Sequence, residues 1–154
     1  MSNKFSEDVA VLGVIDPADA AATAKSTDWA DISKFERFAG IAIPGAIAAA
    51  IACKLQQATT ATGAGAKQIG TCDLTFSTSA DNKQCIIEGK ADDLDTANSF
   101  RWARLTMTPA TSGTNILTGI FLGYKPRYGP ASDNDLASVD TIADPGTTDA
   151  TITA

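Results

Sequence analysis

The chain has no histidine among its 154 residues and only three cysteines. Histidine is the commonest general base and the commonest metal ligand in proteins, so its absence removes the usual starting point for catalysis and for zinc binding. Cys53, Cys72 and Cys85 are far apart and form no CxxC pair, so no zinc site is indicated. We expect three free thiols that act as small apolar side chains in a reducing compartment, with a bridge between two of them as the alternative.

Charge and long apolar runs are also scarce. Charged residues make up 19% of the chain, the net charge is −6, and no run of Lys and Arg occurs, so we expect no direct nucleic-acid partner. The most apolar run, residues 40–53, is interrupted by Pro44 and Gly45 and is shorter than the about 20 residues of a membrane span. Glu7 and Asp8 lie where a signal peptide needs apolar residues. These features predict a protein without a membrane partner that is made in the cytoplasm.

Motifs that carry chemistry are missing as well. The glycine-rich residues 63–67 lack the spacing of a phosphate-binding loop, and no nucleophile elbow occurs. The acidic cluster Asp92, Asp93 and Asp95 has ligands that calcium accepts, but its spacing is not that of an EF-hand. A turn before Phe100, in which the aspartates accept backbone N–H groups, is favoured. We therefore expect no cofactor, no metal and no enzymatic activity.

The sequence is instead rich in the patterns of β-strands. In Phe100–Thr108, apolar residues alternate with polar ones, which predicts a strand with one buried face. Ile116–Leu122 is apolar on both faces, as expected for a strand in the middle of a sandwich. Pro44–Thr59 fits both a helix and a strand, and its neighbours favour a strand. The seven predicted strands are Asp8–Ile15, Phe35–Ile43, Ala49–Ala58, Ile69–Ser77, Cys85–Glu88, Phe100–Thr108 and Ile116–Leu122.

Strands without a confident helix predict an all-β protein, an antiparallel β-sandwich of jelly-roll or immunoglobulin-like layout. The predicted sandwich domain covers residues 1–128. Residues 129–154 contain five aspartates, no Lys or Arg and no aromatic residue, so this segment cannot fold alone. We interpret it as an extended arm that lies along a neighbouring subunit, with Leu136, Val139 and Ile142 as anchors. A disordered tail is the alternative.

Aromatic and arginine residues gather near the predicted strand ends. Trp, Tyr and Arg are the residue types that most often anchor protein interfaces. Packing within the chain and stacking on a sugar ring are the alternatives. The candidates for an interface are Trp102, Arg104, Tyr124, Arg127 and Tyr128, together with the three anchors of the arm.

Four segments together resemble a family of small virion proteins of tailed bacteriophages. They are VLGVIDPADAA at residues 11–21, KLQQATTATGAGAK at 54–67, DNKQCIIEGKADDLDTANSFRWARLTM at 81–107 and LGYKPRYGPASDND at 122–135. Cys85, Gly89 and Trp102 depart from the family pattern, and the chain after Asp135 is not covered by it.

The resemblance implies a head decoration (cement) protein on the exterior of the virion. Its implied partner is the major capsid protein, whose subunits it would bridge, and it implies a homo-oligomer such as a trimer. A head–tail joining, head-fibre-base or tail component is the alternative within virions. A carbohydrate- or host-binding module that uses Trp102 and Tyr128 is the alternative of another class.

Overall fold

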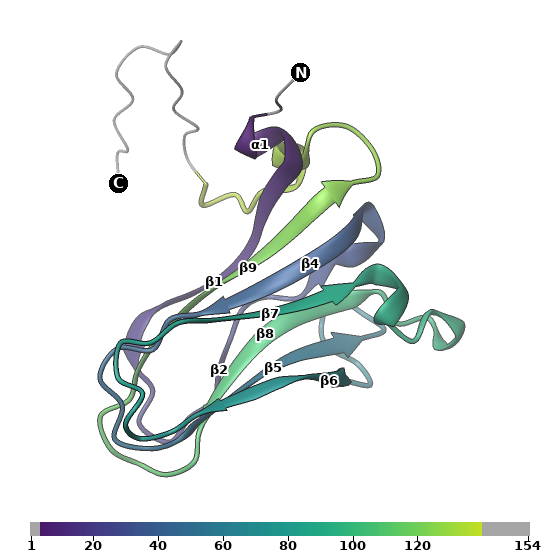
Figure 1. Ribbon diagram of the computed structural model, residues 1–154. Coiled ribbons are helices and arrows are strands. Elements are labelled where there is room, and N and C mark those ends of the chain that lie inside the picture. The colour runs from purple at the N-terminus through teal and green to yellow at the C-terminus, as the bar shows by residue number, and fades with distance from the viewer. Residues whose placement is uncertain (1–3, 140–154) are drawn as a thin grey trace, which may run out of the picture.

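The structure, a computed structural model, describes residues 4–139. Two antiparallel sheets pack face to face (Figure 1), which confirms the predicted β-sandwich. Sheet A has the strand order β1-β9-β4-β7, and sheet B has the order β2-β8-β5-β6 with β3 also paired to β8. Sheet A consists of β1 (Val9–Asp19), β4 (Phe35–Ala42), β7 (Cys85–Lys90) and β9 (Ile116–Pro126). Sheet B consists of β2 (Lys25–Ser26), β3 (Ala30–Asp31), β5 (Ile51–Ala58), β6 (Lys67–Phe76) and β8 (Trp102–Pro109).

The pairing decides between the two predicted layouts. The first strand pairs with the last, β2 and β3 pair with β8, β4 pairs with β7, and β5 pairs with β6. The first half of the chain is therefore matched against the second half like one long hairpin that has been rolled into two sheets. This nesting is the arrangement of a jelly roll.

All seven predicted strands are present, with ends shifted by a few residues. The predicted end of the first strand at Ile15, before Asp16 and Pro17, is wrong, because β1 continues to Asp19. Pro17 lies at an irregularity between Ile15 and Ala18 on an edge strand, where its missing N–H breaks no ladder bond.

The sequence analysis also missed short elements. The segment between the first two predicted strands forms β2, β3 and the 3-10 turn η1 (Ile32–Lys34), and the amino-terminal residues form the one-turn helix α1 (Phe5–Asp8). Two-residue strands are too short for an alternating pattern, and they exist because β8 offers them an edge to pair with.

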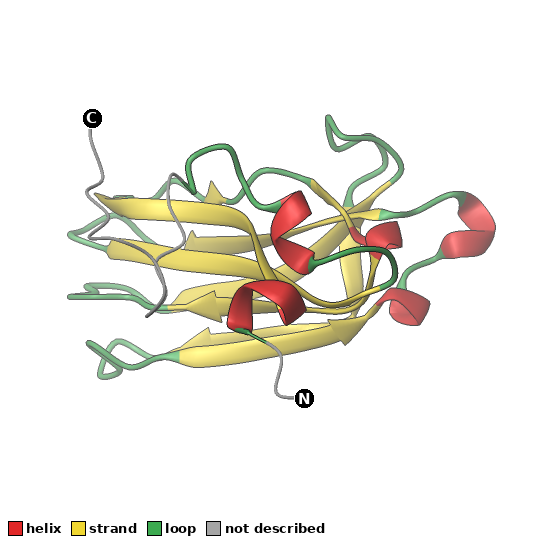
Figure 2. Ribbon diagram, turned by 90° about the horizontal axis from the view of Figure 1, so that it is seen from above, coloured by secondary structure: helices red, strands yellow, loops and turns green. Residues whose placement is uncertain are grey.

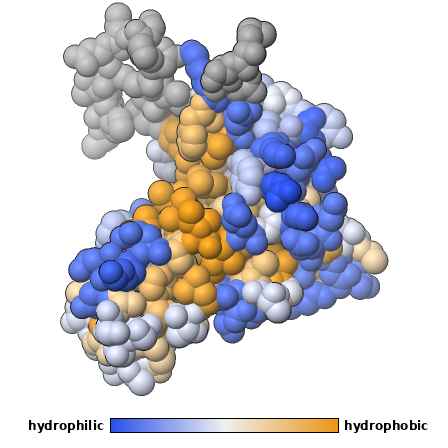
Figure 3. Space-filling model, in the orientation of Figure 1, coloured by the Kyte–Doolittle hydropathy of each residue, from blue (hydrophilic) through white to orange (hydrophobic). Residues whose placement is uncertain are grey.

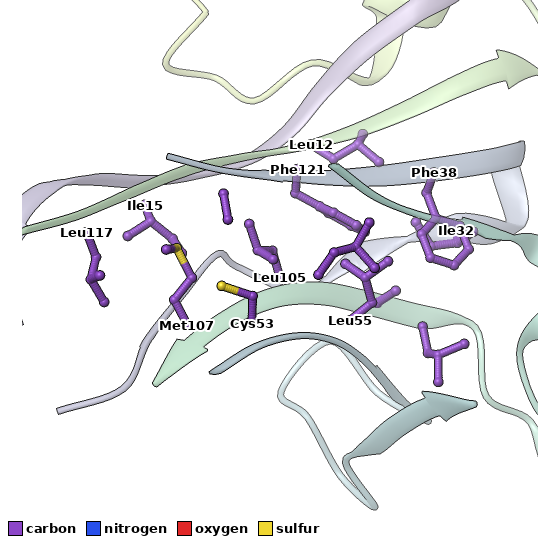
Figure 4. Close-up of a cluster of buried hydrophobic side chains, with 14 of the residues drawn as sticks. Leu12, Ile15, Ile32, Phe38, Cys53, Leu55, Leu105, Met107, Leu117 and Phe121 are labelled. Atoms are coloured by element: carbon purple, nitrogen blue, oxygen red, sulfur yellow. The ribbon is translucent and has the colours of Figure 1, made fainter. Parts of the chain in front are cut away.

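The core lies between the sheets (Figure 4). Phe38 and Phe121 from sheet A meet edge to face, with ring centroids 5.9 Å apart, and point toward Leu55 and Leu105 of sheet B. Glycine at position 89 leaves room for this packing, because a Cβ there would lie 2.5 Å from the Phe38 ring. The three apolar residues of β8 that the alternation places inward, Ala103, Leu105 and Met107, are fully buried, and Thr106 on the opposite face is buried as well.

Helical turns lie at one end of the strands, and the other end has loops only (Figure 2). At the loop end the fully buried Asn115 holds three segments together. Its Oδ1 accepts hydrogen bonds from the backbone of Ala48 and Ala49, and its Nδ2 donates to the carbonyl of Ala21 at 2.7 Å and to two nearby carbonyls. A buried amide with every polar atom satisfied fixes how these loops sit relative to each other.

The chain stays on the sandwich past residue 128. The turn η4 (Ala131–Asn134) buries Ala131, and Leu136 donates its backbone N–H to the carbonyl of Val11. Asp135 accepts the Val11 N–H at 2.6 Å. These bonds pair part of the free edge of β1, which otherwise exposes backbone groups to solvent. The start of the predicted arm therefore lies against its own domain, and residues 140–154 lie outside the described part of the chain.

Candidate interaction surface

The outer face of sheet A carries apolar side chains across its whole width. Val14, Ile120, Ile41 and Ile86 are cross-strand neighbours on β1, β9, β4 and β7, in that order. One level along the strands, Val11, Leu122 and Ala39 are neighbours in the same way. We call this surface the apolar face and define it by six residues: Val11, Val14, Ile41, Ile86, Ile120 and Leu122.

These side chains are not covered by the described chain. Ile86 is 62% exposed and Val14 is 39% exposed, and the residues of the two central strands are half-buried only by their neighbours in the sheet. Figure 3 shows an orange area in the middle of the molecule, over β1, β9 and β4. Contiguous apolar patches of this kind on a soluble protein mark sites where another surface binds.

A polar border closes one side of the apolar face. Tyr124 pairs with Arg37 across β9 and β4, and Arg37 pairs with Lys90 across β4 and β7. The Tyr124 hydroxyl donates to Glu88 Oε1 at 3.1 Å. Partial burial, followed by this carboxylate, raises the pKa of Tyr124. An apolar centre with a polar border is the usual anatomy of a protein interface.

The outer face of sheet B is polar and satisfies its own hydrogen bonds. Gln56 Oε1 accepts from Arg104 Nε at 3.0 Å and from Thr106 Oγ1 at 2.8 Å. Thr106 Oγ1 also shares a hydrogen bond with Ser26 on β2. Lys54, on the same strand as Gln56, lies opposite Asp73 of β6. This surface resembles an ordinary solvated sheet face, so the two outer faces of the sandwich differ in kind.

Two of the predicted interface residues belong to the sheet B side. The Arg104 guanidinium lies over the ring of Trp29 at 4.4 Å, so this tryptophan packs onto the outer face of sheet B. Trp102 is half-buried, with Arg101 over its ring at 5.5 Å. Both tryptophans line a cleft of about 250 Å³ beside Lys34. For Arg104 the structure therefore shows intramolecular packing, one of the predicted alternatives.

Three predicted residues follow one another along and after β9. Tyr124 lies in the border of the apolar face. The Arg127 side chain donates to the carbonyl of Phe35 at 3.1 Å, and Tyr128 is 80% exposed. The structure does not bring these three residues together with Trp102 and Arg104 into one cluster.

Two of the three predicted anchors of the arm lie within the described residues, and one lies outside them. Leu136 is half-buried beside β1, and Val139 is the last described residue. Ile142 lies outside the described residues, so the structure places two of the three anchors.

The acidic cluster forms hydrogen bonds within its own turn, as predicted. Asp93 accepts the backbone N–H of Lys90, and the backbone carbonyl of Asp95 accepts that of Phe100. The Asp95 carboxylate pairs with Lys67 at 2.6 Å, and this hydrogen bond, with a second one from Asn98, lowers the pKa of Asp95. Within residues 4–139, no group of three or more His, Cys, Asp or Glu side chains is arranged to hold a metal ion.

The three cysteines are free thiols. Cys53 points into the core from β5, and Cys85 packs against the same core from β7. Their interaction, together with burial, raises the pKa of Cys53, so this thiol stays protonated. Cys72 donates a weak hydrogen bond to the carbonyl of Glu88 and thereby links the edges of the two sheets.

The sequence analysis missed the apolar face because it interpreted apolar residues on both faces of a strand as a sign of burial on both faces. Phe35–Ile43 and Ile116–Leu122 have apolar residues at outward as well as inward positions. The apolar outward positions were therefore visible in the sequence. Seven strands are enough for two sheets and leave no third layer, so apolar residues on the outer side of a strand have nothing in the chain to cover them.

No protein-family model matches the chain, and no curated protein matches it. No helix in the described part of the chain has the length and apolar character needed to span a membrane.

Proposed function

We propose that this protein is a structural component of a tailed-phage virion that binds the outside of the capsid and stabilises it by bridging major capsid subunits. The observation that carries the proposal is the apolar face. A protein that is presented on an exposed lattice gains from burying such a face against protein, and each buried square ångström of apolar surface contributes roughly 25 cal/mol.

Two further observations support this function. Four segments between residues 11 and 135 resemble small virion proteins, and they include β7 and the end of β9, which carry Ile86 and Leu122 of the apolar face. The jelly roll is also a frequent fold of viral capsid domains, which is support by analogy only, because one fold hosts many functions.

In this role the protein performs no reaction and acts by occupying a surface. Many weak contacts on a repeating lattice add up to strong attachment, because each bound contact raises the local concentration of the next. The acidic surface, with a net charge of −6, keeps the free protein soluble until it meets the shell.

The test is the distribution of the chain on purified particles, measured by cryo-electron microscopy and by quantitative gel densitometry. A decoration protein is expected over the whole shell, in many copies, and its removal should lower the temperature at which shells rupture. Density confined to a single vertex would instead assign the chain to head–tail joining. Absence of the chain from the exterior would reject the proposal.

The cleft between Trp29 and Trp102 favours a second candidate, a carbohydrate-binding module. Aromatic faces stack on sugar rings, and the cleft of about 250 Å³ also offers Lys34 and Asp31 as polar groups. A glycan array separates the two candidates. Strong signals that Trp102→Ala abolishes would support the second candidate, and a blank array would leave the structural role.

A further inference from the structure

We propose that Cys53 and Cys85 are a redox-sensitive pair, which closes into a disulfide bond between the two sheets when the folded chain meets a low-molecular-weight disulfide. Three cysteines allow three pairings, and the fold selects one of them. The bond lies inside a single chain and needs no partner. The inference therefore goes beyond the proposed function and holds or fails independently of it.

Both side chains point into the space between the sheets. Cys53 lies on β5 and is fully buried, and Figure 4 shows its side chain pointing from sheet B into the core. Cys85 begins β7 on the same face as the buried Ile87, whereas Ile86 between them points outward and is 62% exposed. The two thiols therefore enter one core from opposite sheets.

The two sheets converge on the side of the sandwich where these strands lie. Sheets that pack face to face are ordinarily about 10 Å apart, whereas a disulfide needs Cα atoms about 4.4–6.8 Å apart. At the edge formed by β6 and β7, Cα atoms of the two sheets come within 8 Å of each other, and the Cys72 thiol reaches the carbonyl of Glu88 at 3.5 Å. Cys53, on the neighbouring strand β5, is a side-chain hydrogen-bond partner of Cys85, so the two sulfur atoms lie next to each other.

Cys72 is too far away to replace either partner. It lies beside Glu88, three residues along β7 from Cys85, and three residues of a strand span about 10 Å. Relative to Cys53 it is diagonal, because Cys53 pairs with Leu74, two residues further along β6. Diagonal neighbours on adjacent strands lie about 7–8 Å apart, whereas the Cβ atoms of a disulfide lie about 3.5–4.5 Å apart.

The exchange starts at Cys85, the more accessible thiol of the pair. Cys85 is half-buried, and its pKa is lowered by the hydrogen bond from the Cys53 thiol and, to a smaller extent, by the backbone of Ala42, against the opposing effect of burial. The Cys85 thiolate attacks one sulfur of glutathione disulfide and forms a mixed disulfide. The released glutathione thiolate takes up the proton that Cys85 has lost.

Cys53 completes the bond. The largest cause of its raised pKa is the hydrogen bond with Cys85, and this cause ends once the Cys85 sulfur is bonded to glutathione. The Cys53 sulfur then attacks the Cys85 sulfur and displaces the second glutathione, which takes up the Cys53 proton. Two protein thiols are thereby oxidised, and one glutathione disulfide is reduced to two glutathione molecules. The burial of Cys53 persists, which makes the second step the slower one.

The bond joins strands that no hydrogen-bond ladder connects. β5 belongs to sheet B and β7 to sheet A, and the bond closes a loop of about 30 residues. Such a crosslink lowers the conformational entropy of the unfolded chain, so the oxidised protein is more stable than the reduced one. A chain made in a reducing compartment gains this stability when it reaches oxidising surroundings.

The experiment treats the folded full chain with glutathione disulfide and maps the products by mass spectrometry after digestion with trypsin. Lys54 and Lys83 separate the three cysteines, so each cysteine lies on its own tryptic peptide. The expected product joins the Cys53 peptide to the Cys85 peptide and leaves Cys72 free. The same treatment in urea is the control, and it should give mixed pairings. An unreacted folded chain, a bond to Cys72, glutathione that stays on Cys85, or a bond between two chains overturns the inference.

Thermal unfolding measures the effect on stability, and each variant is compared with itself, oxidised against reduced. The midpoint of the wild type should rise by roughly 5–15 °C on oxidation. Cys85→Ser and Cys53→Ala should show no rise, whereas Cys72→Ser, the matched control, should show the rise of the wild type. The comparison within each variant removes any change that the substitution makes to the reduced fold. A bond that forms without raising the midpoint overturns its stabilising role.

Discussion

Both sheets of the sandwich are antiparallel, but the outward side chains of sheet B are polar and those in the middle of sheet A are apolar. On sheet B, outward Gln56, Thr106 and Arg104 bond one another, and Trp29 folds over the guanidinium. On sheet A, outward Ile41, Ile120 and Leu122 have only their neighbours in the sheet. The inner faces are alike, since both are apolar. Packing between the sheets therefore explains the inner faces, and hydrogen bonds within sheet B satisfy its outer face, whereas no described contact of the chain covers the apolar face.

Both sheets depend on the loops at the end of the strands that has no helical turn, and Asn115 holds these loops together. Asn115→Ala should lower the free energy of unfolding by about 3 kcal/mol, because the buried N–H of Ala49 loses its acceptor and three carbonyls lose the Nδ2 donor. The N–H of Ala48 keeps the carbonyl of Thr114 as an acceptor. Thr114→Ala, at the exposed position before it, should change that energy by no more than about 0.5 kcal/mol. Urea denaturation measures both, and equal effects would contradict the role given to the amide.

A second prediction separates inward from outward positions on one strand. Leu105→Ala should cost about 2–5 kcal/mol of unfolding free energy, because the side chain is fully buried against sheet A. Thr108→Ala on the outer side of the same strand should cost less than about 0.5 kcal/mol. Chemical denaturation of the two variants provides the measurement. A small effect of Leu105→Ala would mean that the sheets do not pack as described.

A third prediction sharpens the difference between the outer faces. Ile120→Thr should lower the unfolding free energy by about 1 kcal/mol, since the side chain is half-buried, and should reduce the binding of an apolar fluorescent dye to the folded protein. Thr75→Ser on the outer side of sheet B should change neither quantity. Dye titration at low protein concentration measures the exposed apolar surface. Unchanged dye binding by Ile120→Thr would show that the apolar face is already covered in the free chain.

The smallest effect is expected from the pair that ties β6 to the turn before β8. The hydrogen bond from Lys67 holds the pKa of Asp95 below its ordinary value, so the folded state gains stability above about pH 4 and loses it as the pH falls through the lowered pKa. Asp95→Asn should therefore weaken the protein slightly at pH 7 and flatten the decrease of stability toward acid. Urea midpoints at neutral and acid pH measure this effect. An unchanged acid slope would show that the exposed pair contributes nothing.

The sequence predicted the strands that have a period and missed those that do not. Phe100–Thr108 alternates, and the apolar residues that the alternation places inward, Ala103, Leu105 and Met107, are fully buried. Pro44–Thr59 fitted two structures, and only pairing with β6 and β8 makes Ile51–Ala58 a strand. β2 and β3 owe their existence to the edge of β8 and have no local signal.

The predicted interface residues show the same division. Residue type predicts both Tyr124 and Arg104 as interface residues. Tyr124 lies beside the apolar face, whereas the Arg104 side chain forms its hydrogen bond within sheet B. Ile86 is not among the predicted interface residues, although it is the most exposed residue of the apolar face. Residue type alone does not reveal on which side of a sheet a side chain lies or whether another layer covers it.

By itself the sequence determined that this chain forms β-strands, that they make two layers, and that no histidine is available for chemistry. These properties follow from composition and from a two-residue period, which are local. Only the tertiary structure decided that the strands nest as a jelly roll and that the outward side chains of β4 and β9 stay uncovered. Burial depends on which segments meet in space, and residues as distant in the chain as Val14, Ile41, Ile86 and Ile120 become one surface only when the strands pair.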